Sequence, residues 1–306
     1  MPITPTLVPP PDSCDCHMHV YEARYPILPT WTAPIPKAPA ADYLHVQREL
    51  GLQRVVVVQP NAYGFDNGCT TDAIATFGTQ ARGVAIVAPD IMDTELQRLH
   101  AGGIRGARLH MLPGGMFSWN DVRAIAERVA SMHWHVQVQL DGRDLPKVDA
   151  LLRALPTSIV IDHNGKFLEP VSVDDPAFVC LLRLLDTGRC WVKLSAPYET
   201  SKTGAPRYED VSVLARALAK HNPERCVWAT NWPHPGRATP PESAALLDLL
   251  QDWAPDAATR HRVLVDNPAE LYGFQAAPAG ITTPRDALAA AAELRRLAAA
   301  AAHRGR

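Results

Sequence analysis

The sequence lacks the features that would point to a nucleic acid, a membrane or an export route. Its 30 basic and 32 acidic residues give a formal net charge of −2, which is too small to attract a nucleic-acid backbone or an anionic membrane. No apolar run approaches the roughly 20 residues that a membrane-spanning helix needs. The N-terminal stretch has neither the basic start nor the apolar core of a signal peptide, so we expect a cytoplasmic protein.

The sequence has no cysteine motif for a metal, and it lacks a glycine-rich phosphate-binding turn. The six cysteines include no CxxC pair and no zinc-finger spacing, so we expect Cys14 and Cys16 to be buried packing residues rather than metal ligands. The first predicted strand ends in CDCHMHVYE, without the glycines that a doubly wound dinucleotide-binding sheet requires at this point. The 306 residues, 47% of them apolar, are instead typical of a globular protein of enzyme size.

Short apolar runs alternate with stretches of helical period along most of the chain. We predict strands at 13–20, 54–58, 83–87, 103–109, 134–140, 158–161, 190–194 and 225–230, and helices near 42–50, 70–80, 93–101, 119–132, 144–155, 176–186, 208–221 and 241–253. Continuously apolar strands such as VVVVQ are typical of a parallel sheet covered by helices. Eight strand–helix units over about 250 residues predict an α/β protein with a (β/α)8 TIM barrel.

Two segments stand apart from this alternation. Proline recurs in residues 24–40, which therefore cannot form a regular helix or a central strand. Residues 276–306 are rich in alanine and are predicted to form a C-terminal helical tail without chemistry. We expect a single barrel domain over residues 1–275, followed by this tail.

Polar side chains gather where the predicted strands end, which is where TIM barrels place their chemistry. His17 and His19 end the first strand, and strand alternation places them on one face together with Asp15. Two imidazoles on an inward face are costly to bury without partners. His163 follows the sixth strand and Asn231 the eighth. The other candidates at strand ends are Asn61, Arg108, Gln139, Asp141, Lys166, Lys193, Tyr198 and His234.

These residues resemble the pattern of the amidohydrolase superfamily, which has His-x-His on the first strand, a His on the sixth and an acidic residue on the eighth. The resemblance runs from about residue 13 to Phe274. The segments VVVVQPNAYGFDN, GGIRGARLHMLPGG, IVIDHNGKF, ATNWPHP and DNPAELYGF are similar to the branch of the superfamily that acts on lactones.

Two departures from the superfamily pattern shape the expected chemistry. In metal-dependent members the fifth strand supplies a ligand, usually His, and the eighth supplies Asp. Here the corresponding positions are Gln139-Leu-Asp141 and Asn231. His17, His19 and His163 could form a zinc site by themselves, but it would lack the anionic ligand that strengthens such a site. Because the lactone branch is metal-free, the resemblance implies no metal and no cofactor.

The second departure concerns the reaction. In the lactonases of this branch the eighth-strand Asp is thought to activate water, and an amide such as Asn231 cannot act as a base. Lactone-isomerising members carry the same Asn in a TNWPH context. We therefore expect a metal-independent lactone isomerase that interconverts 1,5- and 1,4-lactones of a sugar diacid such as galactarate by intramolecular transesterification. The alternatives are a lactonase acting on a carboxylated lactone, a metal-dependent decarboxylase of the same fold, and a binding protein that has lost its chemistry.

Each candidate residue has an expected role in this reaction. His163 or Asp141 would act as the base, His17 and His19 would polarise the carbonyl, and Asn231 would donate to the oxyanion. The remaining candidates would bind the substrate: Arg108, Lys166 and Lys193 its carboxylate, Asn61 and Tyr198 its hydroxyls, and Gln139 and His234 other polar groups. The expected partner is a small sugar-acid lactone, with no nucleic acid or membrane, and a homo-oligomer stays open.

Overall fold

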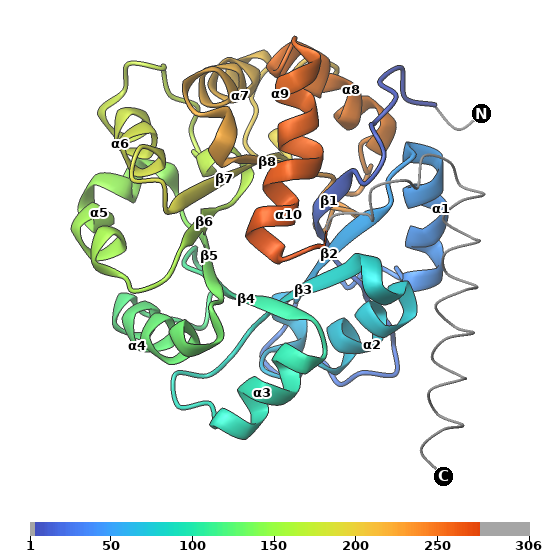
Figure 1. Cartoon of the computed structure of the whole chain (residues 1–306), viewed down its shortest axis with the longest axis vertical. Helices are drawn as coiled ribbons and strands as arrows, with labels where there is room; N and C mark the ends of the chain where they lie inside the picture. Colours follow the sequence, from blue (N-terminus) through green and yellow to red (C-terminus); the bar gives the residue numbers. More distant parts are fainter. Residues whose placement is uncertain (1–3, 276–306) are drawn as a thin grey trace. The chain divides into compact units, whose positions relative to one another are not determined.

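Eight parallel strands form a ring in sequential order in the computed structural model, which describes residues 4–275 (Figure 1). The strands are Cys14–Met18 (β1), Arg54–Val58 (β2), Ala81–Ala85 (β3), Ile104–His110 (β4), His135–Gln139 (β5), Ile159–Ile161 (β6), Cys190–Ser195 (β7) and Cys226–Ala229 (β8). This arrangement confirms the predicted (β/α)8 barrel. The alanine-rich tail predicted at 276–306 lies outside the described residues.

The ring closes through backbone hydrogen bonds just beyond the end of β8. The amide of Asn231 donates to the carbonyl of His17, and the amide of His19 donates to the carbonyl of Trp232, both at 2.8 Å. The main chain of three predicted site residues therefore joins the last strand to the first.

Helices on the outside cover the ring, as Figure 1 shows. They are Ala40–Leu50 (α1), Gly68–Phe77 (α2), Asp93–Ala101 (α3), Trp119–Val129 (α4), Leu145–Ala154 (α5), Pro176–Leu185 (α6), Glu209–His221 (α7) and Ser243–Trp253 (α8). Two of these helices begin with a side-chain cap: Ser118 and Asp121 form a capping box at α4, and Asp175 caps α6 in front of Pro176. None of the helices in the described range is long and apolar enough to cross a membrane.

Two short helices that the sequence pattern did not predict follow α8. Ala257–His261 (α9) and Asn267–Tyr272 (α10) are joined by a π-helical turn at Arg262–Asp266, and they lie across the middle of the ring in Figure 1. The side-chain amide of Asn267 donates to the carbonyls of Pro223 and Cys226, at the start of β8. The ring of Tyr272 packs edge-on against His135, the first residue of β5. This segment therefore covers the amino-terminal end of the barrel.

One predicted strand is displaced by two residues. The strand expected at 83–87 begins at Ala81, because Ala81 and Arg82 already pair with Val55 and Val56 of β2. The proline-rich segment has no helix or strand between residues 24 and 37, as predicted. A single antiparallel bridge between Tyr21 and Ala38 holds the two ends of this segment together.

The close contact between β4 and β5 at the amino-terminal end gives a test of the fold. A Cβ atom on Gly106 would lie 2.3 Å from Nε2 of the buried His135. We expect Gly106→Ala to lower the free energy of unfolding by about 1–3 kcal/mol, because the imidazole cannot move aside in a packed core. Urea denaturation measures the change. In the double variant Gly106→Ala/His135→Ala, the loss of unfolding free energy should be smaller than the sum of the losses in the two single variants. A loss equal to that sum would contradict the contact.

Candidate active site

A cavity of about 640 Å³ opens at the carboxyl-terminal side of the barrel, within the size range of small-molecule sites. The proline-rich segment supplies one wall through Trp31 and residues 33–36, and the loop after β8 supplies another through residues 233–238. The polar side chains that line the cavity are His19, Asn61, Arg108, His110, Gln139, His163, Glu199, Asn231, His234 and Arg237.

The structure brings most of the predicted site residues to this cavity. Those on its lining are His19, Asn61, Arg108, Gln139, His163, Asn231 and His234. His17 and Lys193 lie fully buried beneath the lining. The hydroxyl of Tyr198 is 2.9 Å from both Asn231 Nδ2 and His234 Nδ1. Lys166 forms an ion pair with Glu199.

Asp141 is a predicted site residue that the structure places outside the cavity. Its side chain is not part of the cavity lining. Both carboxylate oxygens accept hydrogen bonds from Arg143, and the backbone amide of Arg143 donates to Oδ1. The aspartate thus caps the short helix that follows β5, a structural role. The expectation that Asp141 acts as the base finds no support in this geometry.

Asp15 also differs from the strand alternation that was expected. The pairing of β1 with β2 shifts in register between Asp15 and Met18, so simple alternation does not hold across the His-x-His motif. The Asp15 carboxylate accepts hydrogen bonds from the backbone amide and the hydroxyl of Thr230, and from the hydroxyl of Tyr43 on α1. It therefore links β1 to α1 and to the end of β8 and lies outside the cavity.

A buried ion pair lies beneath the cavity. Lys193 Nζ is 3.6 Å from Asp162 Oδ1, and both side chains are fully buried. Lys193 also donates to Gln137 Oε1 at 2.6 Å, and the Gln137 amide donates to Asp162 Oδ2 at 3.1 Å. Burial alone favours the neutral acid, but the charges of Lys193 and Arg108 hold the pKa of Asp162 below its ordinary value.

This arrangement determines which nitrogen of His17 carries the proton. Nδ1 of His17 lies 3.1 Å from Lys193 Nζ, 3.4 Å from the Gln137 amide nitrogen and 3.4 Å from Asp162 Oδ1. Because the nearest of these groups is a donor, we assign Nδ1 as the acceptor and place the proton on Nε2. Nε2 lies 3.2 Å from Nε2 of His19. His19 donates its own Nδ1 proton to the carbonyl of Val58 at 2.7 Å, which leaves its Nε2 as the acceptor. Hydrogen bonds thus run from Lys193 through both imidazoles to β2.

The imidazoles of the site are neutral at physiological pH. Burial lowers the pKa of His19 to about 3. It also holds the pKa of His17, beside Lys193, and that of His163 well below their ordinary values. The pKa of His234 falls to about 4 for the same reason. These rings can donate or accept a hydrogen bond, but they are poor proton acceptors near pH 7.

Asn231 lies at the end of β8 with a left-handed backbone, φ 60°, a conformation that Asn adopts readily. Its Nδ2 donates to Tyr198 Oη at 2.9 Å and to Glu199 Oε1 at 2.8 Å. His163, Lys166 and His234 also have positive φ. Such backbones are held only by the surrounding structure and cluster at functional sites.

Three lining residues were missed by the sequence reasoning. His110 is the last residue of β4 and follows Arg108 by two positions, so strand alternation alone could have identified it. Glu199 ends a single 3-10 turn after β7, and Arg237 lies in the loop after β8. Neither loop residue falls within a periodic pattern, so no sequence signal pointed to them.

Several buried polar atoms of the lining have no hydrogen-bond partner among the described residues. They are Trp31 Nε1, Asn61 Oδ1, Arg108 Nε and His110 Nδ1. Buried polar groups in folded proteins nearly always have partners, so these atoms are polar positions at the cavity whose hydrogen-bonding capacity the protein does not use. The guanidinium of Arg108 is held in place by Gln59 and Gln139.

Comparison with known proteins agrees with this geometry. Residues 14–274 match the family model described as amidohydrolase. The chain belongs to the amidohydrolase family. It is 38% identical over 268 residues to D-galactarolactone isomerase of Agrobacterium fabrum, covering 86% of this chain and 91% of the relative.

A hydrolase and a solved structure are also similar to this amidohydrolase. The chain is 34% identical over 284 residues to the 2-pyrone-4,6-dicarboxylate hydrolase of Comamonas testosteroni, covering 89% of this chain and 93% of that protein. A crystal structure of an Agrobacterium tumefaciens protein without ligand superposes with a TM-score of 0.83 at 37% identity, covering 89% of this chain and all of that one.

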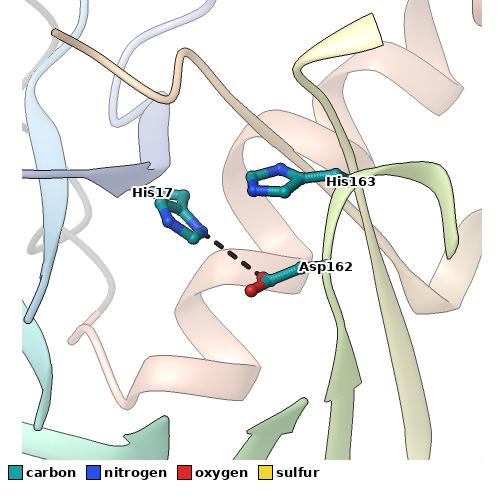
Figure 2. A group of neighbouring side chains, drawn as sticks. All are labelled: His17, Asp162 and His163. Atoms are coloured by element: carbon teal, nitrogen blue, oxygen red, sulfur yellow. Dashed lines mark ion pairs between the residues drawn. The ribbon is translucent and has the colours of Figure 1, made fainter. Parts of the chain in front are cut away.

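The donor set of this amidohydrolase can be tested against a metal ion. His17, Asp162 and His163 bring ligand atoms within 4.8 Å of one another (Figure 2). However, Asp162 is already paired with Lys193, and the same ammonium lies 3.1 Å from Nδ1 of His17, so a cation of the protein already occupies this donor set. A divalent cation needs deprotonated nitrogens and unneutralised anionic oxygens. These residues therefore do not fit a metal.

The ion pair beneath the cavity gives a test of the site's architecture. We expect Lys193→Met to lower the free energy of unfolding by about 3–5 kcal/mol, because Asp162 would be left buried and unpaired. Lys202→Met is the control, since Lys202 pairs with Glu169 at the exposed surface and should change stability by less than about 1 kcal/mol. Urea denaturation of both variants at pH 7 measures the difference, and equal effects would contradict the role of the buried pair.

Proposed function

We propose that this amidohydrolase is a metal-independent lactone isomerase that interconverts the 1,5- and 1,4-lactones of a sugar diacid such as galactarate. The observation that carries the proposal is the amide of Asn231 at the end of β8, facing a cavity whose unpartnered polar atoms suit a hydroxylated, carboxylated ligand. The similarity to a galactarolactone isomerase supports it. A cytoplasmic location is part of this proposal.

The reaction moves an ester bond within one molecule. The hydroxyl on C4 of the lactone attacks the C1 carbonyl, the C1–O4 bond forms and the C1–O5 bond breaks. Because the attacking hydroxyl and the carbonyl belong to the same molecule, positioning supplies much of the rate increase. In the cavity, Arg108 would bind the free carboxylate, and Asn61 and His110 would bind hydroxyls. The carbonyl would lie against His19 and His163, with His17 behind them.

A lactonase remains the second candidate, because a similar protein is named as a pyrone dicarboxylate hydrolase. The two reactions differ in the nucleophile. Hydrolysis needs an activated water at the carbonyl, and Asn231 has no basic lone pair with which to activate one.

The reaction can be followed directly by proton NMR of the enzyme with galactaro-1,5-lactone in D2O. We expect the 1,4-lactone to form faster than the open diacid, after subtraction of the enzyme-free rate. All carbon-bound protons should be retained, since only an oxygen-bound proton moves. Formation of the diacid as the first product would identify a lactonase instead, and loss of carbon dioxide would identify a decarboxylase.

The amide at position 231 gives a second prediction. Asn231→Asp keeps a residue type that adopts the left-handed backbone, so the variant should fold. The new carboxylate would lie against Glu199, and two such groups share a proton at neutral pH. We therefore expect the proportion of hydrolysed product to increase, and to increase further between pH 6 and 9 as that proton is lost. An unchanged ratio of diacid to 1,4-lactone across this range would contradict the role assigned to the amide.

A further inference from the structure

We propose that Glu199 is a catalytic residue of this site and carries the proton from the attacking hydroxyl to the departing ring oxygen. The proposal rests on the lactone isomerisation proposed above for the same cavity. Of the described residues that line the cavity, Glu199 is the one with a carboxylate side chain. The side chain is 15% exposed, so it is largely shielded from solvent while it remains open to the ligand.

The other acidic residues near the site are unsuited to this transfer. Asp162 is fully buried beneath the lining and paired with Lys193. Asp15 is surrounded by Thr230, Tyr43 and the amide of His17. Asp141 lies outside the cavity, with both oxygens bound to Arg143. None of these three carboxylates lines the cavity that would hold the substrate.

The imidazoles of His17, His19 and His163 already take part in other hydrogen bonds. His17 points its protonated nitrogen toward His19, whose Nε2 is already occupied by that hydrogen bond. His163 binds Ser195 Oγ through Nδ1 at 2.8 Å, and burial holds its pKa well below the ordinary value. An imidazole with a lowered pKa can polarise a carbonyl by donating a hydrogen bond.

The neighbours of Glu199 hold its carboxylate in position and leave it able to react. Oε1 accepts from Asn231 Nδ2 at 2.8 Å, and Oε2 is paired with Lys166. Each carboxylate oxygen has two lone pairs, so each keeps one after these contacts. The ammonium of Lys166 favours the ionised form, which is the form that takes up a proton.

One carboxylate can both accept the proton and return it. Glu199 takes the proton of the C4 hydroxyl as its oxygen bonds to C1, and the carbonyl electrons move to the oxyanion. When the oxyanion collapses, the C1–O5 bond breaks and O5 takes the same proton from Glu199. The attacking and departing oxygens are on adjacent carbons, so one group can reach both. The enzyme ends the cycle in its starting protonation state.

Glu199→Gln tests this role, because it keeps the shape of the side chain and removes the basic oxygen. General acid–base catalysis contributes about 10²–10⁴-fold, so kcat for 1,4-lactone formation should fall at least about 100-fold, with KM changed less than about threefold. The residual kcat should rise about tenfold per pH unit above pH 7, since hydroxide then replaces the lost base. Glu199→Asp should restore part of the rate.

Two control variants separate catalysis from structure. Glu169→Gln removes a surface carboxylate paired with Lys202 and should leave kcat unchanged. His163→Gln should lower kcat and keep the wild-type shape of the pH profile, since it leaves the base in place. Binding of the 1,4-lactone, measured by calorimetry, should be similar in Glu199→Gln and the wild type if the site is intact.

The outcomes distinguish this proposal from the proposed function. If the wild-type enzyme forms no 1,4-lactone, the isomerase proposal fails, and the role of Glu199 fails with it. If the wild type isomerises and Glu199→Gln retains a kcat within threefold, the role of Glu199 alone is overturned. Loss of lactone binding together with activity in Glu199→Gln would make Glu199 a structural residue, and would also overturn the proposal.

Discussion

The ion pair between Lys193 and Asp162 is the interaction on which the site depends. Its two charges lie fully buried inside the barrel, and such charges are tolerated only when each has a partner. Through its contact with Nδ1, Lys193 places the proton of His17 on Nε2. That proton in turn fixes the hydrogen bond to His19 and the orientation of both rings. The ion pair does not line the cavity, but it determines the protonation and orientation of the His17 and His19 rings.

The cavity combines a fixed cation with neutral rings. Arg108 is buried and held by Gln59 and Gln139, and burial keeps the neighbouring imidazoles uncharged. A substrate carboxylate would be attracted to the guanidinium of Arg108, because an arginine binds a carboxylate through strong charge-assisted hydrogen bonds. The hydroxyl-binding groups surround the same space. This distribution suits a polar ring with one acidic substituent better than it suits an apolar ligand.

The barrel was predictable from sequence because short apolar strands alternate regularly with stretches of helical period. The strand-end residues His19, His163 and Asn231 were found by the same reasoning, since strand ends meet at one side of a barrel. Glu199 was not, because it lies in a loop whose path depends on tertiary contacts. Asp141 was assigned to the cavity from its place after β5, but its carboxylate instead caps the turn with Arg143. The position of a residue after a strand predicts that it lies near the carboxyl-terminal side of the barrel. The direction of its side chain is decided by local hydrogen bonds.

The closure of the barrel has a consequence for how such a site can change. The bonds that join the first strand to the last are made by the main chain of His17, His19, Asn231 and Trp232. These bonds do not depend on which side chain the backbone carries, provided that it tolerates a left-handed conformation at position 231. One substitution there can therefore alter reactivity without reopening the ring. An exchange between a water-activating Asp and an Asn at this position during evolution would therefore leave the barrel closure intact.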